Sequence, residues 1–181
     1  GDGHVHELRL QDGWIGADLT AISGAPVANS CPIAYVRGDG INAIIYKSNN
    51  HIHELRLDNG WEVADLTLLS GAPDPMSGLS AYVRSDGIST INYAGIDGHI
   101  HDIRLQGTWI RSDLTAISGA PGTPNKPYGH VRSDGINAIV YATAGATPGH
   151  IYELYLDDGW KYYELTSVPN AVLGYSPVPY V

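Results

Sequence analysis

Alternation of apolar and polar residues is the first pattern that the chain shows. In the string "HIHELRL", residues 51–57, every second side chain would face the same side of an extended strand. The string returns with small changes at 4–10, 99–105 and 150–156. A continuous apolar run, "INAIIY" at 41–46, precedes the second copy. Both patterns predict strands, because they are short, rich in β-branched residues and bounded by turn residues.

The alternating string belongs to a longer repeat. The first histidines of the four copies are separated by 47, 48 and 51 residues, and one tryptophan per copy keeps the same spacings. These residues are His4, His51, His99 and His150, and Trp14, Trp61, Trp109 and Trp160. Self-similarity at such a period indicates one supersecondary unit that recurs along the chain. We therefore interpret residues 1–181 as one domain of tandem repeats.

Each full unit predicts four strands and no helix. "AYVR" is followed by an "SDG" turn, "INAIVY", "HIHELRL" and, after "DNG" or "DDG", by "GWEVADLT". Asp-Gly and Asn-Gly are the pairs that tight hairpin turns require. Four strands and a tryptophan in 47–51 residues are typical of a β-propeller blade, and a β-sandwich would not need four nearly identical units. We predict an all-β propeller with about four blades, each a four-stranded antiparallel sheet.

One blade is expected to be incomplete within this chain. The sequence opens in the third strand of a unit and runs through three full units, and "PVPYV" at 177–181 then matches the first-strand segment "PIAYV" at 32–36. No copy of the second strand is left for the shared blade. Residues upstream of Gly1 or a second chain would have to complete it, because an unpaired strand edge is a template for association. We therefore expect a homo-oligomer or a second chain that completes the ring.

Composition and charge exclude several classes of partner. The chain carries a formal net charge of -9 and only ten Lys and Arg residues, so nucleic acid is not an expected partner. The apolar runs are too short to span a bilayer, which argues against membrane insertion. Cys31 is the single cysteine and excludes an intrachain disulfide. Phe is absent while Tyr and Trp supply all aromatics, a composition that favours half-wet recognition surfaces.

An acidic residue and an arginine share one face of the third strand. In the third copy these are Asp102 and Arg104, and alternation places His99 and His101 on the opposite face. The acidic residues of the four copies are Glu7, Glu54, Asp102 and Glu153. Because Asp18, Asp65 and Asp113 recur on the fourth strand, we expect each arginine to pair with carboxylates on both strands. A ligand role for the same residues is the alternative.

Tryptophans and turn arginines are further candidates for a site. Trp14, Trp61, Trp109 and Trp160 would pack one blade on the next, or serve as stacking platforms for sugar rings. The "RSDG" turns need Asp and Gly for their backbone conformation but do not need an arginine. Arg37, Arg84 and Arg132 would therefore line a polar ligand site at one end of the blades, or form a solvated rim.

Histidine pairs raise the question of a metal ion. Two imidazoles at positions i and i+2 of a strand point the same way, but zinc takes three or four ligands, and the fourth copy has Tyr152 in place of its second histidine. We interpret the pairs as structural and expect no metal and no cofactor. His130, which stands where other copies have a tyrosine, is interpreted as a packing substitution. The sequence also lacks "GxSxG", "HExxH" and Walker motifs, so we expect no catalytic residues and no enzyme.

In "INAIVY" followed by "GHIYELYLDDGW", the chain resembles the blades of fucose-binding propeller lectins of the Aleuria type. The resemblance implies a sugar site between adjacent blades, with an arginine and a glutamate from neighbouring strands and a tryptophan platform. The family glutamate matches Glu7, Glu54 and Glu153, with Asp102 as a shortened version. The family arginine falls on Ile44, Ile91 and Ile139, so only a different arginine could supply the cation.

These patterns lead to one favoured function and one alternative. The favoured function is multivalent carbohydrate binding at equivalent sites in each blade, with glycans as partners. The candidate ligand-binding residues are Glu7, Glu54, Asp102, Glu153, Trp14, Trp61, Trp109, Trp160, Arg37, Arg84 and Arg132. The alternative is a structural or protein-interaction propeller that assembles with other copies of itself and binds no sugar.

Overall fold

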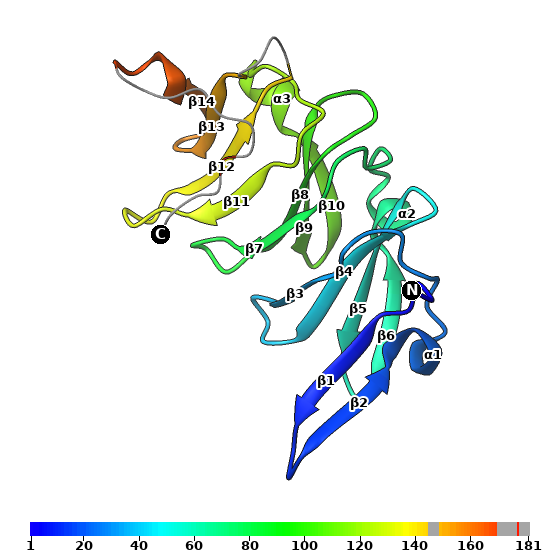
Figure 1. Cartoon of the computed structure of the whole chain (residues 1–181). Helices are drawn as coiled ribbons and strands as arrows, with labels where there is room; N and C mark the ends of the chain where they lie inside the picture. Colours follow the sequence, from blue (N-terminus) through cyan, green and yellow to red (C-terminus); the bar gives the residue numbers. More distant parts are fainter. Residues whose placement is uncertain (145–148, 170–176, 178–181) are drawn as a thin grey trace.

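The computed structural model describes residues 1–144, 149–169 and 177 and forms a β-propeller of antiparallel blades (Figure 1). Three sheets have four strands and one has two. The half-blade holds β1 (His6–Leu10) and β2 (Trp14–Asp18). The first blade holds β3 (Ile33–Val36), β4 (Asn42–Ser48), β5 (His51–Leu57) and β6 (Trp61–Asp65). The second holds β7 (Ser80–Val83), β8 (Ser89–Ala94), β9 (Ile100–Gln106) and β10 (Thr108–Asp113). The third holds β11 (Tyr128–Val131), β12 (Asn137–Ala142), β13 (Ile151–Leu156) and β14 (Trp160–Glu164).

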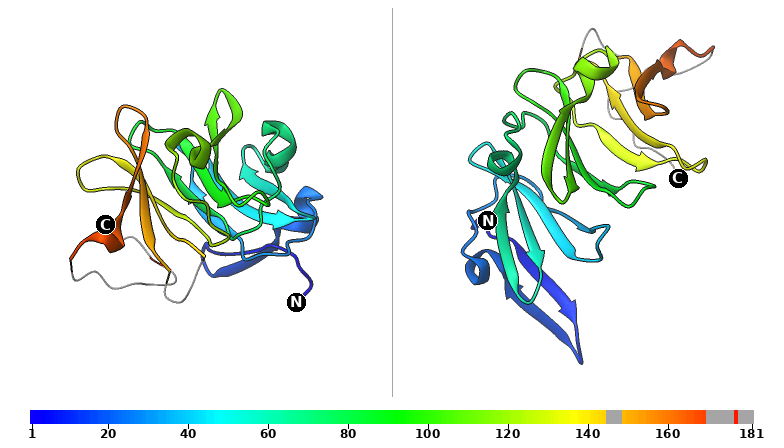
Figure 2. Two further views of the ribbon diagram at one scale, coloured as in Figure 1. Left: turned by 90° about the horizontal axis from the view of Figure 1, so that it is seen from above. Right: turned by 180° about the vertical axis from the view of Figure 1, so that it is seen from behind.

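The strands of each blade follow one another in sequence order. Each pairs antiparallel with the next, and β3, β7 and β11 of successive blades contact one another at the inner end of the sheets (Figure 2). The predicted propeller, with about four blades of which one is incomplete, is confirmed. The expected match of 177–181 to a first strand lies outside the described residues, apart from Pro177.

The hydrophobic core lies between blades. One cluster joins the first and second blades through Ile45, Ile91 and Trp109, and a second joins the second and third blades through Ile100 and Tyr141. A third cluster packs the half-blade on the first blade. A single sheet cannot shield both of its faces from water, so each blade depends on its neighbours for burial of its apolar residues.

The hairpin turns confirm the interpretation of the Asp-Gly and Asn-Gly pairs. Asn59 and Gly60, between β5 and β6, have φ values of 55° and 151°. Asp158 and Gly159, between β13 and β14, have φ values of 51° and 106°. Two successive positive φ values match the twist of the flanking strands, and Asn, Asp and Gly tolerate them best.

The prediction that each unit contains no helix is wrong. A one-turn helix follows the fourth strand in three copies: α1 (Leu19–Ser23), α2 (Leu66–Ser70) and α3 (Leu114–Ser118). In α2 the carboxylate of Asp65 accepts a hydrogen bond from the amide of Leu68, and Gly71 ends the helix with a φ of 63°. The aspartate and glycine of the "DLT…SG" segment are therefore helix caps. In the fourth copy Glu164 makes no such cap, and only the 3₁₀ turn η1 (Leu165–Ser167) forms.

No helix within the described ranges is both long and apolar enough to cross a lipid bilayer.

Candidate functional site

The site begins with a turn arginine at the inner end of the first blade. Arg37 follows β3, and its backbone amide donates to the carbonyl of Ile41 over 2.9 Å, which closes the turn. The guanidinium donates through Nη2 to the carboxylate of Asp39, two residues further along the same turn. The Arg37 side chain is only 7% exposed, so its position is set by the turn and by the residues packed around it.

A buried carboxylate lies behind the arginine. Nη1 of Arg37 donates to Oε2 of Glu54 on β5 over 3.2 Å, and the Glu54 side chain is fully buried. Burial raises the pKa of Glu54, and the nearby guanidinium opposes this shift. Within the described part of the chain, Glu54 Oε1 and Arg37 Nε have no hydrogen-bond partner. The pair thus retains hydrogen-bonding capacity that the protein does not use.

The neighbouring blade completes the site with an aromatic ring. The guanidinium carbon of Arg37 lies 5.9 Å from the centroid of the Trp109 ring on β10 of the second blade. This geometry is that of a cation–π contact. Trp109 is 5% exposed, so its ring is covered and serves here as a packing surface for the arginine. The three residues therefore lie together across a blade boundary, as the resemblance to propeller lectins implies.

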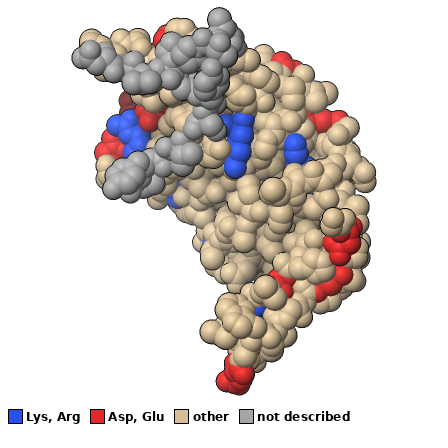
Figure 3. Space-filling view, viewed as in Figure 1, with Lys and Arg blue, Asp and Glu red and all other residues tan. Residues whose placement is uncertain are grey.

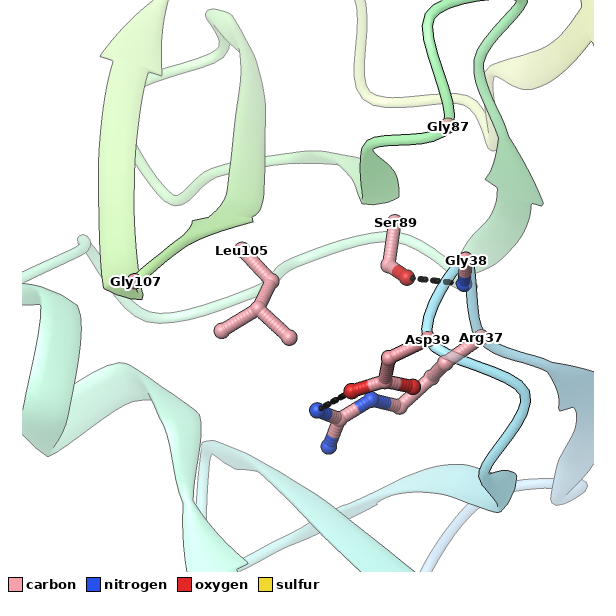
Figure 4. A pocket seen from close by; sticks show the side chains of 7 residues that line it. All are labelled: Arg37, Gly38, Asp39, Gly87, Ser89, Leu105 and Gly107. Carbon is pink, nitrogen blue, oxygen red and sulfur yellow. Dashed lines mark hydrogen bonds and ion pairs between the residues drawn. The ribbon is translucent and has the colours of Figure 1, made fainter.

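A hollow of about 450 Å³ opens beside this cluster (Figure 4). It is lined by Arg37, Gly38, Asp39, Gly87, Ser89, Leu105 and Gly107. The Ser89 hydroxyl accepts a hydrogen bond from the Gly38 amide over 2.9 Å, which links the two blades (Figure 4). The wall therefore offers a guanidinium, a carboxylate, a hydroxyl and one apolar side chain.

Small residues distinguish this hollow from the equivalent places in the repeat. Ser85 and Ser133 occupy the position of Gly38, and asparagine replaces Ser89 in the other two blades. A Cβ atom on Gly38 would lie 1.7 Å from the carbonyl oxygen of Gly87, so the two backbones approach too closely for any other residue. The sequence analysis did not select Asp39, Ser89 or Leu105. The departures of Gly38 and Ser89 from the repeat were the signal that could have indicated them.

The other blades vary the same arrangement. In the third blade Arg132 donates to Glu153 over 3.3 Å and to Asp134 over 2.7 Å. In the second blade Arg84 binds Asp86, and the shorter Asp102 accepts instead from Arg104, at 3.2 Å. Asp102 is fully buried, and burial raises its pKa. An arginine and an acidic residue thus meet directly in the first and third blades.

The half-blade contributes an acidic residue without a turn arginine. Glu7 and Trp61 line a second hollow, of about 480 Å³, between the half-blade and the first blade. The remaining tryptophans differ in exposure. Trp14 on the half-blade is 72% exposed, and Trp160 on β14 is partly buried against the cluster that joins the second and third blades. The eleven candidate residues are therefore distributed over four blade faces, and only Arg37, Glu54 and Trp109 meet as a complete set among those described.

The expected ion pairs between the third-strand arginines and the fourth-strand aspartates are absent from the described residues. Oδ2 of Asp65 instead lies 2.6 Å from Nδ1 of His51, while Oδ1 caps helix α2. Asp113 and His99 repeat the contact at 2.7 Å. The prediction failed because the helix turns the aspartate toward the histidine face of the strand. Arg56 pairs instead with Glu62, at 2.6 Å.

Comparison with known proteins supports the fold. No protein-family model matches the sequence, and no curated protein does. A fucose lectin from Kordia zhangzhouensis, solved with methyl-fucoside, is 19% identical with a TM-score of 0.45, and the match covers 74% of this chain and 96% of the lectin. An α-L-arabinofuranosidase from Clostridium thermocellum is 13% identical with a TM-score of 0.50 over 88% of this chain. This chain spans 61% of that enzyme's length, and the likeness concerns the fold alone.

Proposed function

We propose that this chain is a multivalent carbohydrate-binding propeller without catalytic activity, and that its sites lie between adjacent blades. The observation that carries the proposal is the contact of the Arg37–Glu54 pair with Trp109 across a blade boundary, beside an open hollow. Each member of this set belongs to a residue type that the repeat reuses. Recurrence of the same residue types on successive blades supports several similar sites, each able to add to overall affinity.

The lining of the hollow suits a sugar. The guanidinium of Arg37 offers fixed donors for ring hydroxyls, Asp39 offers acceptors, and the Ser89 hydroxyl can do either. Leu105 provides an apolar surface for the C–H face of a ring. Glu54 and Trp109 are buried, so in this proposal they position the arginine and do not touch the sugar. A few placed polar groups beside an apolar wall are typical of small-molecule sites.

The charge distribution also favours an uncharged or weakly charged ligand. Figure 3 shows a face dominated by uncharged residues, with lysine and arginine side chains at isolated places. A nucleic-acid partner would need clustered basic residues to displace counterions. The net charge of -9 therefore supports glycans over polyanions as partners.

A glycan array tests this proposal directly. The variant Asp39→Asn keeps the turn, because asparagine also accepts from the backbone, but removes the charged acceptor from the hollow. We expect it to reduce the array signal at least about tenfold, a loss comparable to about 1.4 kcal/mol. The matched control is Asp58→Asn, which makes the same change at an exposed position in the β5–β6 turn. Absence of binding to any immobilised glycan, or equal binding by both variants, would refute the proposal.

The proposal that the chain is not an enzyme has its own support and test. Arg37 engages Glu54 and Arg132 engages Glu153, and this repeated pairing is not the single asymmetric carboxylate pair that a glycosidase uses. We expect no release of nitrophenol from a panel of nitrophenyl glycosides, with nitrophenyl arabinofuranoside included. Turnover that persists in a fully purified sample and disappears in Glu54→Gln would overturn this part of the proposal.

Self-assembly is a second candidate, favoured by the exposed half-blade. Leu8 and Leu10 of β1 are 75% and 70% exposed, and among described strands β1 pairs only with β2. We propose that a second copy of the chain covers this edge. Native mass spectrometry should find a dimer or higher oligomer that Leu8→Lys with Leu10→Lys dissociates. Persistence of the oligomer in that variant, or a wild-type monomer at micromolar concentration, would reject it.

A further inference from the structure

Two copies of the repeat share the motif Asp-Gly-His-x-His, which the proposed function does not use. It occurs at residues 2–6 of the half-blade segment and at residues 97–101 of the second blade. In the other two copies Asn49 and Pro148 replace the aspartate. The motif therefore adds a carboxylate to a histidine pair at two of four equivalent places.

In the second blade this motif gathers four possible metal ligands. The carboxylate oxygens of Asp97 lie 3.0 and 3.1 Å from Nε2 of His101, and Oδ2 of Asp113 lies 2.7 Å from Nδ1 of His99. One ligand atom each from Asp97, His99 and Asp113 lie within 4.8 Å of one another. The rings of the two histidines are stacked, with centroids 6.3 Å apart. Two carboxylates and two imidazoles thus occupy one corner of the blade.

The half-blade repeats this cluster. Ligand atoms of Asp2, His4 and His6 lie within 4.8 Å of one another, and Asp18 Oδ2 lies 2.6 Å from Nδ1 of His4. The four residue types and their order along the chain match those of the second blade. The side chain of His4 is 32% exposed and that of Asp18 is 33% exposed, so the cluster is accessible to an ion from solvent.

We propose that each cluster binds one zinc ion, with Asp97, His99, His101 and Asp113 as ligands in the second blade and Asp2, His4, His6 and Asp18 in the half-blade. Zinc takes four nitrogen, oxygen or sulfur ligands in a tetrahedron, and imidazole with carboxylate is within its range. Two ligands bound at about 2 Å from one ion lie at most about 4 Å apart, so the side chains must rotate slightly to close on it. Each aspartate on the fourth strand keeps its second oxygen for the helix cap.

The turn alone does not explain the aspartate of the motif. Asp97 does accept a hydrogen bond from the backbone amide of His99, over 3.1 Å, but asparagine would make the same contact. In the first blade His51 and His53 stack in the same way, with centroids 6.3 Å apart, although Asn49 stands two residues before them. The stacked pair therefore forms without the carboxylate. What the aspartate adds is a charged ligand.

Zinc titration of the whole chain tests the inference, with native mass spectrometry for stoichiometry and calorimetry for affinity. We expect two zinc ions per chain in the wild type and one in Asp97→Asn. Asp2→Asn combined with Asp97→Asn should lose both, or bind them at least about tenfold more weakly, since even a supporting partner is worth about ten- to a hundredfold in metal affinity. Asp58→Asn, an exposed aspartate outside both clusters, should keep both ions. Calcium should not substitute, because it prefers oxygen ligands.

Thermal denaturation gives an independent readout. Zinc should raise the melting temperature of the wild type and of Asp58→Asn by mass action, and should leave the double variant unchanged. Without zinc the double variant should melt within a few degrees of the wild type, since asparagine preserves the turn. Two zinc ions retained in the double variant, or wild-type affinity no greater than that of the double variant, would overturn the inference. Neither result depends on whether the chain binds a glycan.

Discussion

The guanidinium of Arg37 lies 5.9 Å from the ring centroid of Trp109, although 72 residues separate the two in sequence and they belong to different blades. The arginine is held from behind by Glu54, at 3.2 Å, and the tryptophan is packed in the cluster that joins the two blades. One side chain thus belongs both to the polar hollow and to the seam between blades. Stability and ligand binding are therefore linked at this boundary, and the predictions below separate them.

Replacing Trp109 by alanine should destabilise the chain strongly. The ring is 5% exposed, so its loss leaves a cavity between blades, and such changes cost about 3–5 kcal/mol. Trp14 is the equivalent residue of the half-blade and is 72% exposed, so Trp14→Ala should change the free energy of unfolding by less than about 0.5 kcal/mol in the monomer. Urea denaturation measures both. Equal losses from the two substitutions would contradict the placement of the core between blades.

Introducing serine at position 38 should also destabilise the chain, even though serine stands at the equivalent positions of the other blades. The added Cβ would meet the carbonyl oxygen of Gly87 at 1.7 Å, and relief requires the blades to move apart, at a cost of about 1–3 kcal/mol. The control is the reverse change, Ser85→Gly, which creates no clash. A Gly38→Ser variant with wild-type stability would show that the first and second blades do not approach as closely as described here.

The buried His53 should make stability depend on pH. Burial lowers the pKa of His53 below the ordinary value of 6.5, so the unfolded chain takes up a proton first as the pH falls. The contribution of neutral His53 is therefore present above pH 6.5 and is lost as the pH falls toward the folded pKa, by at most about 1.4 kcal/mol per pH unit. Urea denaturation between pH 7.5 and 5 should reveal this acid-side loss.

The variant His53→Tyr assigns that loss to a single residue. Tyr152 is the natural counterpart in the third blade, where it stacks on Tyr141 with centroids 5.8 Å apart, much as His53 stacks on Tyr46 at 5.7 Å. Tyrosine keeps the stack and does not titrate in this range. The acid-side slope should become shallower than that of the wild type. An unchanged slope would show that His53 is not responsible.

The repeat was sufficient to predict the fold. Four units of similar length, Asp-Gly and Asn-Gly turns and short alternating segments indicated four-stranded blades, and these features are local in sequence. The one-turn helices were missed because "DLT" follows the fourth strand directly, and a five-residue helix has too few positions to display a helical period. The caps, Asp65 and Gly71, were the only local signal of that helix.

The site was predicted less completely, for a physical reason. Arg37, Glu54 and Trp109 were selected as members of a repeated pattern, but their meeting depends on how one blade packs on the next. The lining by Ser89 and Gly38 depends on what the repeat leaves out at one boundary, which appears only when the blades are superposed in space. The partners of Asp65 and Asp113 were assigned wrongly, because the bend into the helix reverses which face of the strand each aspartate reaches.

Placement of the core between blades has a consequence for how the protein folds and how its length can change. Each sheet gains most of its burial from its immediate neighbours, so the free energy approximates a sum over units and nearest-neighbour seams, as in a one-dimensional chain of coupled elements. Tyr93 and Tyr141, buried at two successive seams, then mark steps of a cooperative zipper that can start at any seam. Gain or loss of one repeat by duplication or deletion would add or remove one seam and leave the others intact.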